Sequence, residues 1–311
     1  MDKIVLENVN YVYSQGTPFE HKALNDVSLK IRAGCLTGVI GHTGSGKSTM
    51  MQLLNGLSAP SSGKVLLDGY DINSCLEDVF DVWKQLPEYE KLSKGAAKKA
   101  MKKEIAERRR KLCFRVGLVM QYPEYQLFEE TVFKDIAFGP RNMGLSEEEI
   151  SDRVYEAARF TGVEEDWMEK SPFDLSGGQK RRVALAGVIA MRPEVLVLDE
   201  PGAGLDPRGR NSIFDGIVHY QKTTGSTVLI VSHSMEDMAR LCDDVIVLAD
   251  ARVVRQGSCD EVFAHVDELS SIGLDIPQVT RLLGTLRKEG IPVPEGIYTV
   301  EDAVKALKEL L

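Results

Sequence analysis

A glycine-rich octapeptide is the first segment of this 311-residue chain with the residue types and spacing for phosphate chemistry. Its residues are Gly41, His42, Thr43, Gly44, Ser45, Gly46, Lys47 and Ser48, with Thr49 next. In such a G-x-x-x-x-G-K-[ST] loop the backbone N–H groups converge on phosphates, the lysine reaches the β and γ oxygens, and the final hydroxyl binds Mg²⁺. The apolar run 36–40 precedes the loop and predicts a strand. A helix is predicted after it, with an apolar face of Met50, Met51, Leu53, Leu54 and Leu57.

Two adjacent carboxylates end a second apolar run, residues 195–198. A buried carboxylate is costly unless it serves a cation, so Asp199 is predicted to hold Mg²⁺. Glu200 stands where it could orient and deprotonate an attacking water. A purely structural acid pair is the alternative interpretation, but the phosphate loop already requires a metal partner on a neighbouring strand.

Gln121 and His233 end two further apolar runs, residues 116–120 and 227–231. The side-chain amide of Gln121 can bind Mg²⁺, and its position can then depend on whether Mg²⁺ is bound, which a partner docked beyond it would sense. His233 alone would be interpreted as an ordinary strand-end histidine, yet its spacing from Glu200 favours contact with a γ-phosphate and with the attacking water. Ligands bind at the carboxyl ends of parallel strands, so we expect these side chains to meet in one site.

A second candidate phosphate receptor is the pentapeptide of residues 175–179. Ser176 supplies a hydroxyl, and Gly177, Gly178 and Gln179 place backbone N–H groups at a predicted helix N-terminus. Arg181 and Arg182 follow and are expected to add positive charge. Because the chain already has one phosphate cradle, the second is predicted to serve ATP held by another subunit.

The elements that position these residues indicate an α/β fold. Val27, Leu29 and Ile31 alternate with polar residues, as in a half-exposed antiparallel strand, whereas the continuous apolar runs indicate parallel strands buried on both faces. We predict one nucleotide-binding domain over 1–257, with a helical subdomain over about 122–180, and a helical appendage over 258–311. Within these regions, Ser146 and Glu149 form a capping box that opens a helix over 147–160, and amphipathic helices are expected over 277–288 and 301–311.

Charge and composition exclude some function classes. The net charge of −9 argues against a general nucleic-acid binder. Residues 91–111 nevertheless carry ten basic and two acidic side chains. We predict that this block is a solvated, partly helical segment; contact with anionic headgroups or an acidic partner is the alternative. The sequence has no apolar run long enough to cross a bilayer and no signal-peptide pattern at its start, so we expect a cytosolic origin.

Together these residues resemble the nucleotide-binding domain of ATP-binding cassette (ABC) transporters, over about 4–257. By that resemblance the Walker A motif is 41–48, the Q-loop residue Gln121, the signature 175–179, the Walker B motif 195–199, the catalytic residue Glu200, the D-loop 203–206 and the switch residue His233. Tyr13 takes the place of the aromatic residue that stacks on adenine, with Tyr11 as the competing candidate. The resemblance implies a P-loop NTPase fold with a parallel-sheet core, an antiparallel β subdomain and a helical subdomain, with ATP and Mg²⁺ bound between two subunits.

Three segments are similar, more narrowly, to the ATPases of energy-coupling factor (ECF) transporters, and among them to the second ATPase of the pair. They are 121–128, 135–140 and the opening of the 41–48 loop. This implies ATP hydrolysis coupled to uptake of a vitamin or metal ion, from a peripheral position on the cytoplasmic face of the cell membrane. The implied partners are a second ATPase, as heterodimer or homodimer, an EcfT-like membrane coupling subunit and a substrate-binding membrane subunit, with no nucleic acid. Substrate specificity then lies in another polypeptide.

The chain departs from the family pattern at Gly202, where threonine or serine is usual; we expect this to loosen the approach to the D-loop. The insertion over 76–112 is also longer than the usual connection. Two rival functions account for less of the sequence. A non-transport ABC ATPase acting on ribosomes or DNA typically has two cassettes or a long coiled coil, and a P-loop kinase would not need the signature.

Overall fold

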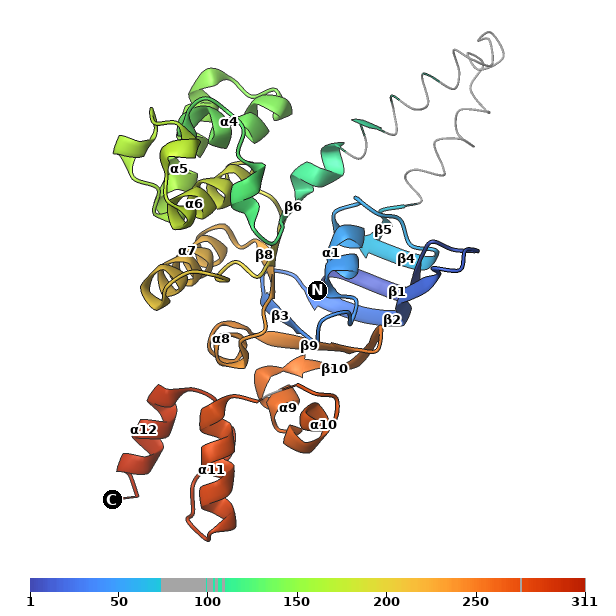
Figure 1. Ribbon diagram of the computed structural model, residues 1–311, viewed down its shortest axis with the longest axis vertical. Coiled ribbons are helices and arrows are strands. Elements are labelled where there is room, and N and C mark those ends of the chain that lie inside the picture. Colours follow the sequence, from blue (N-terminus) through green and yellow to red (C-terminus); the bar gives the residue numbers. More distant parts are fainter. Residues whose placement is uncertain (74–98, 100–102, 104–105, 108–109, 275, 311) are drawn as a thin grey trace.

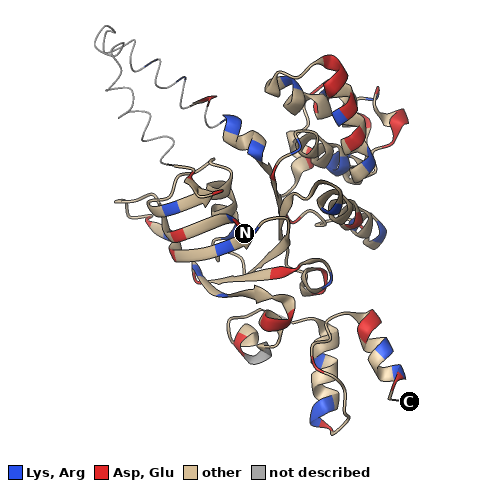
Figure 2. Ribbon diagram, turned by 180° about the vertical axis from the view of Figure 1, so that it is seen from behind, with Lys and Arg blue, Asp and Glu red and all other residues tan. Residues whose placement is uncertain are grey.

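The computed structural model describes residues 1–73, 99, 103, 106–107, 110–274 and 276–310 (Figure 1). Most of the predicted insertion over 76–112, and with it most of the basic block 91–111, lies outside these residues. Its role therefore stays a prediction, as do the predicted domain boundaries. Along the described strands and helices, acidic and basic residues are interspersed (Figure 2).

A six-stranded sheet forms the centre of the molecule, in the order β10-β9-β3-β8-β7-β6. Its parallel strands are β3 (Leu36–Ile40), β6 (Val116–Val119), β7 (Val195–Asp199), β8 (Thr227–Val231) and β9 (Asp244–Ala249). β10 (Arg252–Ser258) pairs antiparallel with β9 and closes one edge. Strands β3, β8 and β9 are buried along their whole length, because layers of other elements cover both faces of the sheet. The predicted parallel core is thus confirmed.

A smaller antiparallel sheet has the order β2-β1-β4-β5. Its strands are β1 (Asp2–Tyr13), β2 (His21–Arg32), β4 (Ser62–Leu67) and β5 (Tyr70–Asp71). The alternation read from the sequence is present: Val27, Leu29 and Ile31 are buried, and the polar residues between them are exposed. The buried face shares one hydrophobic core with β3, β7 and the helix α1 (Lys47–Leu54). That shared core holds the phosphate loop between the two sheets.

The helix after the phosphate loop is shorter than predicted. α1 ends at Leu54, and Gly56 takes a left-handed conformation with φ of 75°. Leu57 therefore lies outside the helix and is 57% exposed, so its assignment to the apolar face was wrong. The side-chain amide of Asn55, which caps α1, donates to the carbonyl of Val116 in β6 and ties the helix end to the sheet.

Helices α4 (Val132–Met143), α5 (Glu147–Thr161) and α6 (Gly177–Ile189) pack together at one end of the molecule, coloured green to yellow in Figure 1. The predicted capping box is present: Ser146 Oγ accepts from the Glu149 N–H at 3.3 Å, and Glu149 Oε2 accepts from the Ser146 N–H at 3.0 Å. Helices α7 (Pro207–Thr224) and α8 (Met235–Leu241) follow β7 and β8. A short 3₁₀ turn, η1 (Pro123–Gln126), lies between β6 of the core sheet and α4 of the helical layer.

The last four helices are α9 (Cys259–Phe263), α10 (Val266–Ser271), α11 (Gln278–Lys288) and α12 (Val300–Lys308). α11 and α12 extend from the lower end of the molecule in Figure 1 and have a small core of their own around Leu283, Val293 and Ala303. They correspond to the two predicted amphipathic segments. Among the described residues, no helix has both the length and the apolar character to cross a bilayer.

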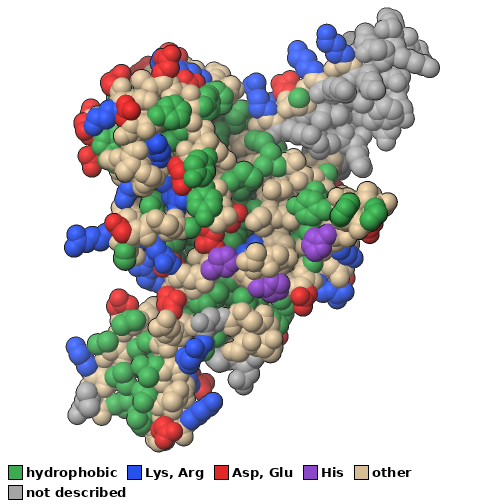
Figure 3. Space-filling view, in the orientation of Figure 1, with side chains coloured by type: hydrophobic (Ala, Val, Ile, Leu, Met, Phe, Trp, Pro, Cys, Tyr) green, Lys and Arg blue, Asp and Glu red, His purple; other side chains and the backbone are tan. Residues whose placement is uncertain are grey.

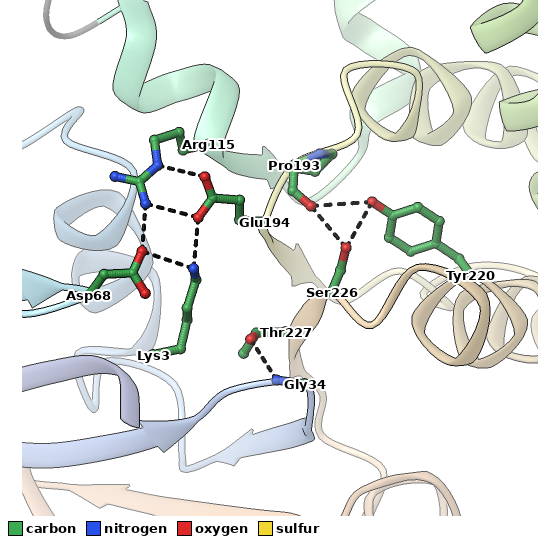
Figure 4. Close-up of polar contacts among 9 residues, drawn as sticks. All are labelled: Lys3, Gly34, Asp68, Arg115, Pro193, Glu194, Tyr220, Ser226 and Thr227. Atoms are coloured by element: carbon green, nitrogen blue, oxygen red, sulfur yellow. Dashed lines mark hydrogen bonds and ion pairs between the residues drawn. The ribbon is translucent and has the colours of Figure 1, made fainter. Parts of the chain in front are cut away.

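Four charged side chains join the two sheets (Figure 4). Lys3 in β1 contacts Asp68 at 2.9 Å and Glu194 at 2.7 Å, and Arg115, just before β6, contacts Glu194 at 2.7 Å and Asp68 at 2.5 Å. The hydrogen bonds with Arg115 and Lys3 outweigh burial and lower the pKa of Glu194 to about 2. No sequence pattern indicated this network, because its members come from four separate segments.

Candidate nucleotide site

A cavity of about 340 Å³ lies where β3, β6, β7 and β8 end. It is lined by Tyr13, His21, Ala23, Thr43, Gly44, Gly46, Lys47, Ser48, Thr49, Gln121, Asp199, Glu200, Val231 and His233. On the face drawn in Figure 3, histidine side chains gather around the middle of the molecule, between the helical layer and the antiparallel sheet. The cavity thus brings together Tyr13 and most of the predicted site residues of the Walker A, Q-loop, Walker B and switch segments. Gly41, His42 and Ser45 lie in the same loop but do not line it.

Two glycines let the phosphate loop turn tightly. A Cβ at Gly41 would lie 2.3 Å from the carbonyl oxygen of Leu248, and one at Gly46, where φ is 102°, would lie 2.4 Å from that of Ala23. Only glycine fits such close approaches to the backbone of neighbouring strands. Lys47 is buried beneath it, and its Nζ donates to the carbonyls of Gly41 at 2.7 Å and His42 at 2.8 Å. Burial lowers the pKa of Lys47.

Ser48 and Asp199 place two oxygen ligands on the cavity wall. Ser48 Oγ donates to Asp199 Oδ2 at 3.2 Å, and the exposed side chain of Gln121 lines the same cavity. Burial raises the pKa of Asp199 and outweighs the hydrogen bond from Ser48 and the charge of Lys47. Hydroxyl, carboxylate and amide oxygens suit Mg²⁺, which usually takes one or two protein ligands plus phosphate oxygens and water. Among the described residues, no group of three or more His, Cys, Asp and Glu side chains is placed to hold a metal ion.

Glu200 combines burial with an unsatisfied oxygen. Its side chain is 12% exposed, and burial, together with the charge of Asp199, raises its pKa to about 7. Oε1 has no hydrogen-bond partner among the described residues, although His233 Nε2 lies 3.3 Å away without hydrogen-bond alignment. Burial and the charge of Lys47 lower the pKa of His233, so this imidazole is neutral at pH 7. A buried carboxylate that lines a cavity and has a pKa near 7 has the properties of a general base.

Tyr13 rather than Tyr11 borders the far end of the cavity. The hydroxyls of Tyr13 and Thr49 are hydrogen-bonded at 3.1 Å, and Tyr11 packs edge-on behind the Tyr13 ring with centroids 4.8 Å apart. His21 also lines this end and was missed by the sequence analysis. The signal that could have found it is strand register, since His21 pairs directly opposite Tyr13 across the β1–β2 ladder. The arrangement offers an aromatic face to a planar base.

The signature residues lie apart from this cavity: none of Ser176, Gly177, Gly178 and Gln179 lines it. Ser176 caps α6, accepting from the Gln179 N–H at 3.4 Å, while Gln179 Oε1 accepts from the Ser176 N–H at 2.8 Å. Ser176 and Gly177 are exposed, and a Cβ at Gly177 would meet nothing within 4 Å. The chain's own fold therefore does not require glycine at position 177, and the helix N-terminus is open to solvent.

One expectation about flanking residues was wrong. Arg181 is buried and paired with Glu124, and Arg182 donates to the carbonyl of Thr161 at 2.8 Å, so neither guanidinium is free for a phosphate at the signature. The looser D-loop approach expected from Gly202 stays a prediction; a Cβ there would lie 2.9 Å from Arg210 Cγ and 3.2 Å from Phe214 Cε2. Neighbouring side chains already fill the space that threonine or serine would occupy.

Comparison with known families matches the region that carries the phosphate loop, the signature and the acid pair. The model described as "ABC transporter" matches residues 24–203, and a second model, "AAA domain, putative AbiEii toxin, Type IV TA system", matches only residues 169–238. The energy-coupling factor transporter ATP-binding protein EcfA2 of Clostridium acetobutylicum is 48% identical, over 99% of this chain and 98% of its own length. The EcfA2 protein of Caldanaerobacter subterraneus subsp. tengcongensis is 47% identical, over 96% of this chain and 94% of its own.

Solved structures agree with these relatives. The protein cbiO1 of Clostridium perfringens, described as part of the ABC transporter complex cbiONQ, superposes with a TM-score of 0.68 at 37% identity, over 91% of this chain and 99% of its own. The ATP-binding cassette MJ0796, solved as a dimer in a post-hydrolysis state with ADP and Pi, gives a TM-score of 0.65 at 27% identity, over 82% of this chain and 98% of its own. Both likenesses support the nucleotide-binding fold derived above.

Proposed function

The chain belongs to the ABC transporter ATPases and, within them, to the ATP-binding proteins of energy-coupling factor transporters, and we propose that it hydrolyses ATP to drive such an importer. The single observation that carries the mechanism is the separation of two phosphate receptors. The 41–49 loop lines a cavity with Glu200, whereas Ser176 and Gly177 face solvent away from it. Two copies of this arrangement complete each other when they meet head to tail.

Within one composite site, ATP places its base against Tyr13 and its phosphates on the 41–49 loop. Lys47 and the loop N–H groups stabilise the charge that develops on the transferring phosphoryl group. Glu200 accepts a proton from the attacking water, for which a pKa of about 7 is well matched. The neutral ring of His233 helps to hold that water in line.

Mg²⁺ would be held by Ser48, Asp199 and Gln121, and when bound it neutralises charge on the phosphate oxygens. These three side chains line the same cavity, which supports their assignment as its protein ligands. Burial disfavours the charged form of Asp199 and raises its pKa, and a bound cation would offset that cost.

The other half of the site comes from a second ATPase subunit. Its signature would supply a Ser hydroxyl and the N–H groups of a helix N-terminus to the γ-phosphate, as Ser176 to Gln179 of this chain would do in return. The open space around Gly177 supports this, because a residue with no neighbour in its own chain has room for an external ligand. The partner is a related ATPase or a second copy of this chain.

Membrane subunits would dock beside the Q-loop. Tyr122, Tyr125, Phe128 and Phe138 are all exposed there, and Phe128 packs edge-on against Phe138 with centroids 4.8 Å apart. Exposed aromatic side chains gathered at one place suit an apolar helix from a partner. We assign that partner as an EcfT-like coupling subunit, with a separate membrane subunit binding a vitamin or metal ion. The chain then works peripherally, on the cytoplasmic face of the cell membrane.

Gly177→Asp tests the two-subunit site. An acidic residue in the first turn of α6 suits the helix dipole and meets no neighbouring atom, so the variant should fold normally and bind ATP in its own cavity. The added charge would repel a γ-phosphate, so hydrolysis at the partner's nucleotide should fall by at least tenfold. Gly177→Ala is the matched control at the same position, because it adds a Cβ that meets nothing within 4 Å and brings no charge. Normal turnover in Gly177→Asp would refute the placement of the signature.

Affinity purification of the tagged full chain from detergent extract tests the transport assignment. Recovery of integral membrane proteins and a second ATPase is the expected result. Recovery of ribosomes or DNA instead would support the rival class of non-transport ABC ATPases and contradict the proposal.

A further inference from the structure

A buried ion pair links the Q-loop to the signature helix. Arg181, in the second turn of α6, is 4% exposed, and it holds Glu124 through a two-pronged contact. Its Nη2 donates to Glu124 Oε1 at 3.0 Å and its Nε to Oε2 at 3.1 Å. Glu124 lies in η1, three residues after Gln121, which lines the nucleotide cavity. The fork geometry fixes η1 against α6 in direction as well as in distance.

The same guanidinium also reaches the D-loop. Arg181 Nη1 donates to the carbonyl oxygen of Ala203, and the Ala203 N–H donates to the carbonyl oxygen of Glu200 at 3.1 Å. A Cβ on Gly178 would lie 3.3 Å from Leu205 Cδ2, so the D-loop also lies against the signature turn itself. One side chain on the signature helix therefore contacts two other segments, the Q-loop turn and the D-loop, which lie far from it and from each other in the sequence.

These contacts bridge two different ATP molecules. Resting on the proposed function, Gln121 and Glu200 serve the nucleotide in this chain's own cavity, while Ser176 and Gly177 serve the partner's. Arg181 is part of the helix that carries Ser176 and Gly177, and it is bonded to the two segments that carry Gln121 and Glu200. A shift of any of these segments must therefore move the Arg181–Glu124 ion pair or break it.

We propose that Arg181 is a positioning residue which, through Glu124 and the carbonyl of Ala203, couples occupancy of one composite ATP site to hydrolysis at the other. Arginine suits this task because its planar fork can bond a carboxylate with two N–H groups and a third acceptor with another. A lysine would keep the charge and lose the geometry. The role is not catalytic, since Arg181 does not line the cavity.

The test must separate coupling from plain stabilisation. Removing one member of a buried pair is strongly destabilising, because it leaves an uncompensated charge, whereas replacing both members by apolar residues of similar volume is often neutral. We therefore compare Arg181→Lys, Glu124→Gln and the double variant Arg181→Met with Glu124→Leu. Arg182→Gln is the matched control, since Arg182 is the next residue on α6 but bonds Thr161 and Ser212 instead.

The measurements use the full ATPase assembly purified through a tag on this chain. In the double variant, thermal stability and ATP binding in this chain's cavity should stay close to wild type, while kcat falls about tenfold and the Hill coefficient for ATP falls towards 1. Arg181→Lys should show the same loss of cooperativity. Arg182→Gln should keep it. Wild-type cooperativity and turnover in a stable double variant would overturn the proposal and leave the proposed function intact.

A second readout does not depend on turnover. On ATP binding, amide hydrogen exchange should slow together in segments 121–126, 176–182 and 201–206 of the wild-type assembly. In the double variant the slowing at 201–206 should be lost while that at 121–126 remains. Equal protection of all three segments in both proteins would refute the coupling, whereas absence of any ATP hydrolysis by the wild-type assembly would refute the proposed function alone.

Discussion

Replacing Glu200 by glutamine should make the protein more stable and much less active. The side chain is 12% exposed, and burial raises its pKa from 4.5 to about 7. A carboxyl whose pKa is higher folded than unfolded binds more protons in the folded state, so its ionisation opposes folding as pH rises. The difference of the two pKa values corresponds to about 3 kcal/mol of unfolding free energy at pH 8, since each unit is worth about 1.4 kcal/mol.

Glutamine has nearly the same shape and carries no charge, so Glu200→Gln should recover that free energy in the nucleotide-free protein. Both side chains sit on the same strained backbone, with φ of 51°, so this strain cancels in the comparison. For a chain of this length, about 3 kcal/mol corresponds to a rise of about 5 °C in Tm. The rise should be complete above pH 7, shrink as pH falls, and vanish below about pH 4.5, where the carboxyl is protonated in both states.

The same substitution should lower kcat by about 10²- to 10⁴-fold while ATP binding is retained, because it removes the general base. In the wild type, kcat/KM reports the free enzyme, so it should rise about tenfold between pH 6 and 8 as Glu200 ionises. Scanning calorimetry across pH and steady-state ATPase assays measure the two effects. An unchanged or lowered Tm at pH 8, or a flat kcat/KM profile from pH 6 to 8, would refute the assignment of a buried, proton-accepting Glu200.

Three further predictions concern other parts of the molecule. Glu194, whose pKa is lowered to about 2, contributes stability that is present above pH 4.5 and is lost as pH falls through 2. Because the side chain is 43% exposed, Glu194→Gln should cost only about 1 kcal/mol in chemical denaturation at pH 7, and this cost should shrink as the pH falls from 4.5 towards 2. Tyr13→Ala should weaken ATP binding about tenfold in fluorescence titrations while Tyr11→Ala has a smaller effect, and equal losses would contradict the choice of Tyr13. Gly202→Thr should lower the unfolding free energy by about 1 to 3 kcal/mol by overpacking against Arg210 and Phe214, and a stabilised variant would show that this packing argument is wrong.

The sequence predicted those parts of the site in which adjacent residues determine the chemistry. The 41–48 loop needs glycine where backbone approaches backbone, as at Gly41 and Gly46, and a lysine at a set distance from them. The carboxylates after β7 follow an apolar run whose burial is itself a sequence property. Strand types, the Ser146 capping box and the separation of the two phosphate receptors were therefore accessible from local patterns alone.

Other features depend on contacts between segments that the sequence does not bring together. Leu57 continues the helical spacing of apolar residues in the sequence, but the left-handed conformation of Gly56 ends the helix before Leu57. Arg181 and Arg182 look equivalent, and only packing against Glu124 and Thr161 gives each a different partner.

Local sequence patterns indicate the secondary structure and the chemistry available to a residue, because secondary-structure propensity and motif spacing depend on neighbours a few positions away in the sequence. From them the sequence determined the α/β fold, the phosphate loop and the acid pair, and it predicted a second subunit. The tertiary structure decided the pKa of Glu200, the choice of Tyr13, the fit around Gly202 and the link through Arg181. Each of these depends on burial or on a partner from a distant segment, and desolvation and ion pairing are set by neighbours in space rather than along the chain.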